Sequence, residues 1–581
     1  MKSVKTLIEI LKNASLKYPR NIVVRNKNTK DKDLTYSELL DEVLLLSNHL
    51  KKVCGERTKI ALMLPNGYAW IKCFFSVIAS GNVIIPIDNN WKYGELMEIV
   101  TEFNINVAIV DDSVDKNLVK KIEYRGINVL DLENLTFEKI KLLAKHKIDN
   151  NDCSAIYFTS GTTGKYKAVM ISQSNLIKDC ISIGNILNLK EESTILNVLP
   201  FYHAFAIMCD VIYPIYLGFT ICISELKNFN QDLLFYLPNY IFAVPLIAEN
   251  ILKYLKIRYK KCRNVYDAKK QVVGEKLEYI ICGGAVIRKN LTKELNYFGI
   301  KLIRGYGITE CSPVVSIEVW NDNSDDLTVG IPIECNKVKI VDNEILVKGE
   351  NVAIGYYGAK NQKLSINGWF KTGDLGYVGE NNKLYINGRR KNLIILSNGE
   401  NISVESLESV FISKGIEQRF IIFEEITYSG EHYLAMLFDA VDMCFEKFKK
   451  KIFSEINNEK FKIKKIYCMD KKFLKTSTHK INRKSSINRY VRLKLFNEIS
   501  NILSDFIYQE IDILPEMELY SDLELDSLEL LRLASTLEER FDVSMKIDDV
   551  FLFTSIDSIL DYFINTYINI DDVVLQWRMR I

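Results

Sequence analysis

The chain has 581 residues, 48% of them hydrophobic and 26% charged, which is typical of globular proteins and argues against a disordered or fibrous chain. A single hydrophobic core stops growing at about 250–300 residues, so a chain of this length is expected to form at least two domains. The formal net charge of +2 predicts no general attraction to nucleic acid or to a membrane surface.

The cysteines and the apolar segments exclude further classes of protein. The 12 cysteines are scattered singly from Cys54 to Cys468 without a Cys-x-x-Cys pair, and the five histidines are dispersed, so no structural zinc site is expected. No segment reaches the roughly 20 apolar residues that span a bilayer, and the N-terminal residues lack the apolar run of a signal peptide. We therefore expect a cytoplasmic protein without a transmembrane segment.

Short apolar runs alternate with segments of helical length through the first two thirds of the chain. This alternation predicts an α/β domain in which layers of helices cover largely parallel sheets. The expected strands are 59–65, 82–88, 106–112, 155–160, 240–245, 279–285 and 301–307. Turns around Gly388 end this domain, and a smaller α+β domain follows. The last part of the chain predicts a helical bundle, with one apolar helix face formed by Leu530, Leu533, Leu537 and Phe541.

These patterns predict four regions and a change of charge between two of them. The expected boundaries are 1–387 for the large domain, 388–485 for the small domain, 494–566 for the helical domain and 567–581 for a C-terminal tail. Residues 447–494 contain 17 lysines and arginines and three acidic residues, whereas residues 512–561 contain 14 acidic and three basic residues. The opposite charges fit electrostatic docking of the two regions, or two separately solvated surfaces.

A turn rich in glycine and hydroxylated residues follows the expected strand at 155–160. Residues 157–169 read Tyr-Phe-Thr-Ser-Gly-Thr-Thr-Gly-Lys-Tyr-Lys-Ala-Val. Backbone N–H and hydroxyl groups in such a turn can surround a polyphosphate, and lysines offset its charge. The spacing from Gly161 does not fit the GxxxxGK[ST] phosphate loop. A turn of this composition is more often only a turn, so its interpretation depends on the motifs that follow.

Further motifs follow this turn in a fixed order. They are Leu199-Pro-Phe-Tyr-His203, Cys282-Gly-Gly-Ala285, Gly305-Tyr-Gly-Ile-Thr-Glu310, Gly368-Trp-Phe-Lys-Thr-Gly-Asp374, Gly388-Arg-Arg-Lys391-Asn392 and Lys475-Thr-Ser-Thr-His-Lys480-Ile-Asn-Arg483. Together with the turn, this string resembles the adenylate-forming superfamily of acyl-CoA synthetases, luciferase-like enzymes and peptide-synthetase adenylation domains. The resemblance covers about residues 1–485, and the shared order makes chance a poor explanation.

The resemblance implies which residues bind ATP. The phosphates would be held by loop residues, namely Thr159, Ser160, Gly161, Thr162, Thr163, Gly164 and Lys167. Adenine would stack on Tyr306 and lie against the turn of Gly283, Gly284 and Ala285. Asp374 would accept hydrogen bonds from both ribose hydroxyls, and Arg389 would contact the nucleotide.

The resemblance also implies the catalytic groups. Thr309 would contact phosphate, Glu310 would help to hold Mg²⁺, His203 would border the acyl pocket, and Lys480 would reach the carboxylate and the α-phosphate. In that family a carboxylate attacks the α-phosphate of ATP, which brings two anions together. The site must therefore supply positive charge, which Mg²⁺ and Lys480 would provide. Lys391 would be the hinge on which the small domain rotates between half-reactions. This chain differs from the family at four loop positions where proline or glycine is usual: Tyr166, Ala168, Leu474 and His479. We nevertheless expect an active enzyme, with altered loop geometry.

The C-terminal region carries a second motif. Residues 521–528 read Ser-Asp-Leu-Glu-Leu-Asp-Ser-Leu and precede an amphipathic helix. A serine at a helix start is normally an N-cap, so this triplet alone is weak evidence. The region resembles acyl and peptidyl carrier domains, which implies 4′-phosphopantetheine on Ser527 and a phosphopantetheinyl transferase as a partner. Glu524 stands where such domains usually have glycine.

Together, the motifs predict that the protein activates a carboxylic acid as acyl-AMP and transfers it to the phosphopantetheine of its own carrier domain. Residues 201–208 are apolar apart from His203, without the aspartate common in amino-acid adenylation domains, and Cys311-Ser-Pro-Val-Val resembles fatty-acid ligases. A fatty or other hydrophobic acid is therefore preferred. Three alternatives stay open: release to free coenzyme A, loading of an amino or aryl acid in a peptide or polyketide pathway, and a non-catalytic scaffold that presents a carrier to downstream acyl-accepting enzymes.

Overall fold

The structure, a computed structural model, divides into two compact units, Met1–Ile386 and Asn387–Ile581. It describes residues 4–27, 33–88, 91, 93–135, 149–160, 166–288, 290–320, 327–358, 364–395, 401–413, 416, 419–439, 463–475, 481–507 and 513–580. Within these ranges no helix is both long enough and apolar enough to cross a bilayer. The division falls one residue from the start expected for the small domain.

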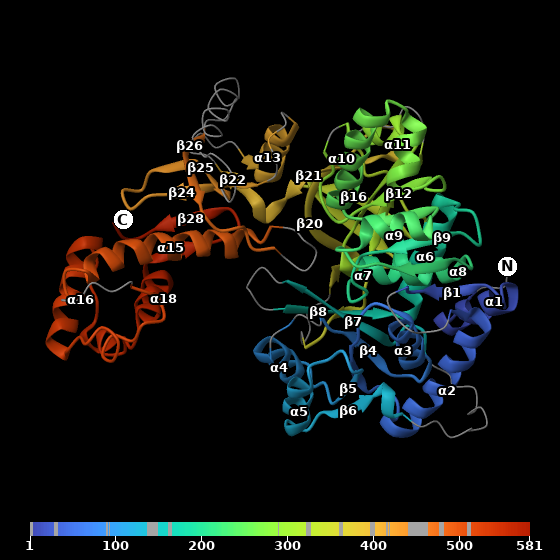
Figure 1. The fold of residues 1–581 in the computed structure, drawn as a ribbon, viewed down its shortest axis with the longest axis horizontal. Helices are drawn as coiled ribbons and strands as arrows, with labels where there is room; N and C mark the ends of the chain where they lie inside the picture. The colour runs from blue at the N-terminus through green and yellow to red at the C-terminus, as the bar shows by residue number, and fades with distance from the viewer. Residues whose placement is uncertain are drawn as a thin grey trace. The chain divides into compact units, whose positions relative to one another are not determined.

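The first unit is built on two mostly parallel sheets surrounded by helices, as the α/β alternation predicts (Figure 1). One sheet has the order β18 (Gly355–Tyr356), β8 (Tyr166–Ser172), β7 (Cys153–Ser160), β4 (Val83–Pro86), β3 (Lys59–Met63), β5 (Val107–Val110) and β6 (Asn128–Asp131). The other has the order β15 (Ile331–Pro332), β14 (Val314–Ile317), β13 (Lys301–Gly307), β12 (Tyr279–Cys282), β11 (Tyr240–Ala243), β9 (Thr194–Asn197), β10 (Thr220–Ile223), β1 (Ile22–Arg25) and β2 (Leu34–Thr35).

Helices form between the strands where apolar residues recur at helical spacing, and a polar side chain caps the start of five of them. They are α1 (Leu7–Lys17), α2 (Tyr36–Cys54), α3 (Tyr68–Ala79), α4 (Tyr93–Glu102), α5 (Lys116–Tyr124), α6 (Gln173–Leu187), α7 (Ala204–Ala206), α8 (Tyr213–Tyr216), α9 (Phe229–Tyr236), α10 (Pro245–Cys262), α11 (Val265–Val272) and α12 (Leu291–Tyr297). Thr35 and Glu38 form a capping box at α2, and Ser172 and Asn175 form one at α6. Both helices begin directly after a strand, so these caps turn the chain from strand into helix.

A third, antiparallel sheet completes the first unit. It contains β16 (Asn336–Val341), β17 (Glu344–Gly349), β20 (Trp369–Val378) and β19 (Ser365–Ile366), and β21 (Leu384–Arg389) leads into the second unit. The first four residues of β17 are all buried, so both faces of this half of the strand are covered. This sheet carries the Gly368–Asp374 motif on β20, and thereby fixes the place of Asp374.

The second unit combines the small α+β domain with the helical domain. Its elements are β22 (Leu393–Ile395), β23 (Asn401–Ser403), α13 (Val404–Ser413), β24 (Phe420–Ile426), β25 (His432–Asp439), β26 (Ile463–Met469), α15 (Arg483–Leu503), α16 (Ser527–Phe541), α17 (Ile547–Val550), α18 (Ile556–Tyr567), β27 (Ile568–Ile570) and β28 (Val574–Trp577). The four apolar residues expected on one face of α16 are all buried.

Two expected boundaries differ from the observed structure of this unit. Helix α15 runs without interruption across the expected gap between 485 and 494. Residues 567–581, expected to be a tail, contain β27 and β28, which join the sheet of order β26-β25-β24-β28-β27. Strand pairing of this kind depends on a partner about 150 residues earlier in the chain, so no local pattern could reveal it.

Candidate functional site

The phosphate-loop motif lies at the end of a hairpin. Strands β7 and β8 pair antiparallel, with Thr159 opposite Lys167 and Ser160 opposite Tyr166. The turn itself, including the predicted phosphate ligands Gly161, Thr162, Thr163 and Gly164, lies outside the described residues, as does the side chain of Ser160. Thr159 is half-buried and Lys167 is exposed, with its Nζ 5.3 Å from the centre of the Tyr356 ring. The lysine is therefore available to an anion next to the turn.

Glu310 lies beside the same tyrosine. It belongs to a single 3-10 turn, Thr309–Cys311, that also holds Thr309, and both residues are half-buried. The Tyr356 hydroxyl donates a 2.7 Å hydrogen bond to Glu310 Oε1. Burial and the neighbouring Glu310 charge raise the pKa of Tyr356, so its phenol stays protonated and keeps donating. Tyr356 therefore lies next to both Lys167 of the phosphate-loop motif and Glu310 of the Gly305–Glu310 motif.

The residues around Glu310 fit a magnesium ion. Mg²⁺ usually binds one or two carboxylates and completes its octahedron with substrate phosphates and water. Glu310 supplies one partly buried carboxylate whose Oε1 is oriented by Tyr356. Among the described residues no cluster of three His, Cys, Asp or Glu side chains could hold a metal by itself. The donor set therefore suits an ion that arrives with a nucleotide.

Replacing Tyr356 by phenylalanine is expected to weaken the apparent affinity for Mg²⁺ about tenfold or more. Removing a hydrogen-bond partner of a metal-binding carboxylate typically costs about 10–100-fold in affinity because the carboxylate loses its orientation. The measurement is a Mg²⁺ titration of adenylate formation at saturating ATP. Tyr357→Phe is the matched control, since the Tyr357 hydroxyl accepts a hydrogen bond from Lys59 Nζ instead. Equal Mg²⁺ dependence in both variants would contradict the assigned role.

Tyr306 and Asp374, expected to bind adenine and ribose, are joined by a direct hydrogen bond. The Tyr306 hydroxyl donates to Asp374 Oδ2 at 2.6 Å, and Asp374 is only 3% exposed. Burial, reinforced by the Asp374 charge, raises the pKa of Tyr306. The backbone N–H of Asp374 donates to Thr372 Oγ1 at 3.0 Å, which fixes the strand at this point. Tyr306 comes from β13 and Asp374 from β20, so side chains of two different sheets meet where the nucleoside is expected.

The turn expected to border adenine lies against two other predicted motifs. It follows β12, and a Cβ placed on Gly283 would lie 3.4 Å from the carbonyl oxygen of Gly305 and 3.6 Å from the Phe205 ring. Gly284 has φ +81°, which favours glycine, and Gly284 and Ala285 are exposed. The turn thus presents open backbone next to the start of the Tyr306 motif, as a flat base would need.

His203 stands at the start of the segment expected to line the acyl pocket. It is the N-cap of α7, its ring centre is 4.5 Å from that of Tyr202, and it is half-buried. The residues after it form α7 and a π-helix, Ile207–Ile212, and are mostly buried and apolar. A Cβ built on Gly283 would lie 3.6 Å from the ring of Phe205 in α7, so the fold places this segment beside the turn expected to border adenine.

Buried polar side chains that sequence reasoning missed hold these motifs in place. Asn351 Nδ2 donates to Asp179 Oδ1 at 2.9 Å and to the backbone carbonyls of Cys311 and Val314 at 2.9 and 2.7 Å. Asp179 on α6 is fully buried, and burial raises its pKa. This network fixes the chain directly after Glu310. Neither residue lies in a recognisable motif, so no sequence signal could have found them.

Two of the predicted residues of the small domain, Arg389 and Lys391, lie within the described residues. Arg389 ends β21 and is exposed, and Lys391 lies in a 3-10 turn with its Nζ 2.6 Å from Asp572 Oδ2. Lys480 lies outside the described residues, so its expected contact with the substrate stays a prediction. The Asp572 contact was not expected, because Asp572 lies in the region predicted to be a tail.

Ser527 is the first residue of α16 and is exposed. The N-cap is Asp526, whose Oδ1 accepts hydrogen bonds from the backbone N–H groups of Leu528 and Glu529, both at 2.8 Å. Glu529 Oε2 accepts in return from the Asp526 N–H at 2.9 Å, which completes a capping box. The Ser527 hydroxyl is therefore not the helix cap. A phosphodiester attached there would also lie at the favourable positive end of the helix.

Glu524, which replaces the usual glycine, has the backbone conformation that favours glycine. Its φ is +54°, in the left-handed region. Glu524→Gly is expected to stabilise the helical domain by about 1 kcal/mol, because the strain of a Cβ in this region is removed. Amide hydrogen exchange of α16 should slow about fivefold. Glu516→Gly is the control: it is also exposed but has no positive φ, so faster or unchanged exchange is expected there.

Two family models match the chain. The model described as AMP-binding enzyme matches residues 11–357, which is more than half of the chain. The model described as phosphopantetheine attachment site matches residues 497–563, which include Ser527. The first match contains the Glu310 and Tyr306 motifs, and the second contains the helix that Asp526 caps.

Individual relatives are distant. A long-chain-fatty-acid–CoA ligase of Bacillus subtilis (strain 168) is 23% identical, with 83% of this chain and 94% of the ligase covered. A chloroplastic long-chain-fatty-acid–[acyl-carrier-protein] ligase of Arabidopsis thaliana is 25% identical, with 67% of this chain and 70% of that protein covered.

Solved structures show the same fold. The o-succinylbenzoate CoA synthetase of Bacillus subtilis, in complex with its acyl-adenylate intermediate, aligns with a TM-score of 0.69 at 20% identity, covering 81% of this chain and 96% of the synthetase. The McyG A-PCP protein, in complex with phenylalanyl-adenylate, aligns with a TM-score of 0.70 at 17% identity, covering 97% and 98% of the two chains. These alignments confirm the predicted fold class. The chain therefore belongs to the AMP-binding, adenylate-forming enzyme family, as an acid–thiol ligase with a C-terminal phosphopantetheine attachment domain.

Proposed function

We propose that this enzyme activates a fatty or other hydrophobic acid as its acyl adenylate and transfers the acyl group to a phosphopantetheine thiol on its own Ser527. The observation that carries the proposal is an exposed serine at a helix start that Asp526 caps, within the phosphopantetheine-attachment match, in the same chain as the AMP-binding match. A thiol tethered to the enzyme acts at an effective concentration on the order of millimolar, which favours it over coenzyme A in solution.

The chain's own residues supply orientation and charge for the first half-reaction. The substrate carboxylate attacks the α-phosphate of ATP, pyrophosphate leaves, and the acyl adenylate forms. Tyr306 and Asp374 hold the nucleoside, and the Lys167 side chain stands beside the phosphate turn. Lys480 is proposed to offset the negative charge where carboxylate and phosphate meet. Mg²⁺ held at Glu310 would neutralise phosphate charge.

Two features support a hydrophobic acid over an amino acid. The segment after His203 consists mostly of buried apolar residues, among them Ala206, Ile207 and Met208. The acidic side chain in this segment, Asp210, is fully buried and accepts a 2.9 Å hydrogen bond from Asn197 Nδ2. Burial raises the pKa of Asp210, so it is a poor charged partner for an α-amino group. The two relatives named for long-chain fatty acids point the same way.

The test is the intact mass of the protein after a phosphopantetheinyl transferase has modified it. The modified enzyme is incubated with Mg-ATP and single acids: saturated fatty acids of rising length, benzoic and hydroxybenzoic acids, and amino acids. We expect a gain of one fatty acyl group. A gain from amino or aryl acids alone would replace the proposed substrate class, and acyl-CoA formed without protein acylation would identify coenzyme A as the acceptor. Failure to form any adenylate would favour the non-catalytic scaffold.

The proposal includes the setting of the enzyme. The described cysteines are free thiols, mostly buried, which suits a reducing cytoplasm. The acyl group on Ser527 would then be taken up by separate acyl-accepting enzymes.

A further inference from the structure

The last residues of the chain form a hairpin that lies beyond both family matches, which end at residues 357 and 563. Strands β27 and β28 pair antiparallel, and β28 pairs parallel with β24 of the small domain. The register places Glu424, Glu425 and Ile426 opposite Val574, Leu575 and Gln576. We call residues 568–580 the C-terminal clasp. It extends the sheet of the small domain, although the chain reaches it only after passing through the carrier domain.

The clasp is bonded to the small domain and to the carrier domain at the same time. On the small-domain side, Trp577 Nε1 donates a 3.0 Å hydrogen bond to Glu425 Oε1, and Trp577 is only 4% exposed. On the carrier side, the backbone N–H of Arg580 donates to the carbonyl of Phe541, the last residue of α16, at 2.8 Å. The two domains also touch directly, since the Tyr428 hydroxyl donates to Asp542 Oδ2 at 2.8 Å.

Helix α15 replaces a linker between the two domains. It is one 21-residue helix, and Figure 1 shows it passing from the strands of the small domain to α16 and α18. One hydrophobic cluster includes Phe423 and Leu437 of the sheet, Val491 of α15, Leu537 of α16 and Leu575 of the clasp. Domains that move independently are normally joined by exposed polar segments with few contacts across them. The carrier and the small domain instead share one hydrophobic cluster.

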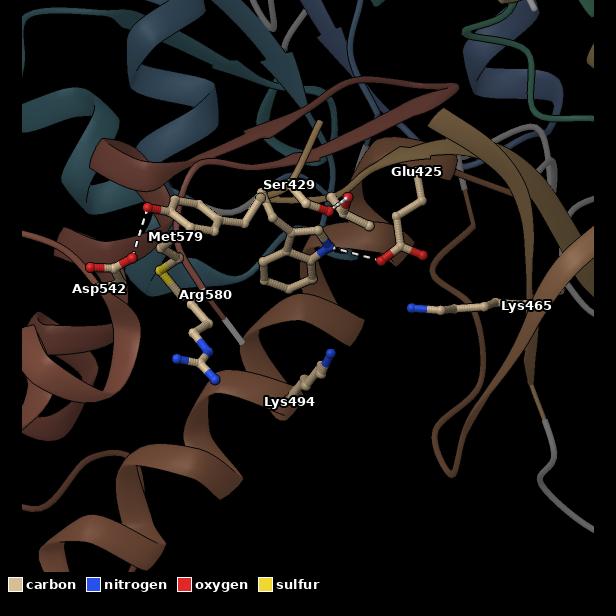
Figure 2. A pocket seen from close by; sticks show the side chains of 10 residues that line it. Glu425, Ser429, Lys465, Lys494, Asp542, Met579 and Arg580 are labelled. Carbon is tan, nitrogen blue, oxygen red and sulfur yellow. Dashed lines mark hydrogen bonds between the residues drawn. The ribbon is translucent and has the colours of Figure 1, made fainter. Parts of the chain in front are cut away.

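A cavity of about 410 Å³ marks the place where these elements meet (Figure 2). Its wall includes Glu425 of β24, Lys494 of α15, Asp542 at the end of α16, and Trp577 and Arg580 of the clasp. Lys494 Nζ lies 5.0 Å from the centre of the Trp577 ring. Small domain, helix, carrier and clasp all line this one hollow, so the four parts meet at a single junction.

The tip of the clasp reaches the point where the chain enters the second unit. Asp572, between β27 and β28, forms the 2.6 Å ion pair with Lys391, five residues after the division at 386/387. The clasp is therefore held at its base by the carrier, along its length by β24 and at its tip by Lys391 of the small domain.

We propose that the C-terminal clasp joins the carrier and the small domain into one rigid body, so that Ser527 is moved by rotation of the whole second unit. The carrier does not swing on a linker of its own during turnover. This statement about delivery rests on the proposed self-loading function, whereas the rigid junction does not. Breaking a strand pairing and a shared core in every cycle would expose Leu575, Trp577 and Met579, which are all buried.

Hydrogen exchange tests the junction without using activity. The full-length, pantetheinylated protein is analysed by mass spectrometry with and without Mg-ATP and a substrate acid. We expect amides of β28 to exchange as slowly as those of β25, within about tenfold, in both states. Exchange of 568–580 at the rate of an unprotected peptide, or exchange that rises more than tenfold during turnover, would overturn the proposal.

A disulfide across the clasp tests delivery. Ile426 and Gln576 are paired neighbours, both half-buried, and adjacent strands bring Cα atoms within disulfide range. We expect the oxidised Ile426→Cys/Gln576→Cys enzyme to load Ser527 within about twofold of the reduced enzyme. A loss of tenfold or more that reductant reverses would show that the clasp must open, and would overturn the proposal.

Two controls separate this result from other failures. Each single cysteine variant, oxidised in the same way, accounts for reactions of the native thiols. If the reduced double variant forms adenylate but never loads Ser527, the proposed self-loading function fails, while the exchange measurement still decides whether the carrier and the small domain form one body.

Discussion

Ser527→Ala is expected to abolish acyl transfer to the protein while adenylate formation proceeds at the normal rate. The substitution removes the only atom to which the phosphodiester could be attached at this helix start. It leaves the helix intact, because Asp526 provides the cap and Ser527 is exposed. Two measurements check this: intact mass after incubation with Mg-ATP and acid, and pyrophosphate exchange for the first half-reaction.

The matched control for this prediction is Ser521→Ala, an exposed serine six residues earlier in the same motif. Ser521→Ala should load to the same extent as the pantetheinylated enzyme without a substitution. Acylation that persists in Ser527→Ala would place the acyl group on another nucleophile and contradict the carrier assignment. Loss of pyrophosphate exchange in the same variant would instead mean that the carrier domain affects the nucleotide site.

Lys480→Ala is expected to slow adenylate formation about 10²–10³-fold, the usual effect of removing one group that stabilises developing charge in a transition state. Transfer of an acyl group from a supplied acyl adenylate to Ser527 should change little, because that step no longer brings carboxylate and phosphate together. Single-turnover measurements of the two half-reactions test both statements on one protein.

Lys484→Ala provides the control for general loss of positive charge. Lys484 is an exposed lysine at the start of α15, in the same basic stretch. An equal, small effect of both substitutions would show that Lys480 acts only as surface charge. An equal slowing of both half-reactions by Lys480→Ala would point to misfolding of the second unit, which hydrogen exchange of β24 and β25 would reveal.

The departure at Ala168 has a structural explanation. It lies in β8 opposite Phe158 of β7, is 2% exposed, and its carbonyl accepts a 2.9 Å hydrogen bond from the Tyr357 N–H. Glycine weakens the interior of a strand, so alanine here favours the regular hairpin that carries the phosphate turn. The change leaves Thr159 and Lys167, the expected phosphate-binding positions on the same two strands, as the family pattern has them.

The sequence by itself determined the parts of this protein that depend on local chemistry. Tyr306, Glu310 and Asp374 stand in motifs whose residue types suit adenine, Mg²⁺ and ribose, and the apolar run at 301–307 predicted the strand β13 that carries Tyr306. The sequence also predicted the apolar face of α16, because helical periodicity places Leu530 and Leu537 on one side.

Only the tertiary structure decided which distant segments meet. Tyr356 bonds to Glu310, and Asn351 bonds to Asp179, across 46 and 172 residues of chain. The clasp pairs with β24, about 150 residues earlier in the chain. The segment expected to be a tail is therefore part of a sheet. The physical reason is that a strand satisfies its backbone hydrogen bonds with whichever edge the folded chain brings near, and side-chain pairing across a buried junction leaves no periodic signal in either segment.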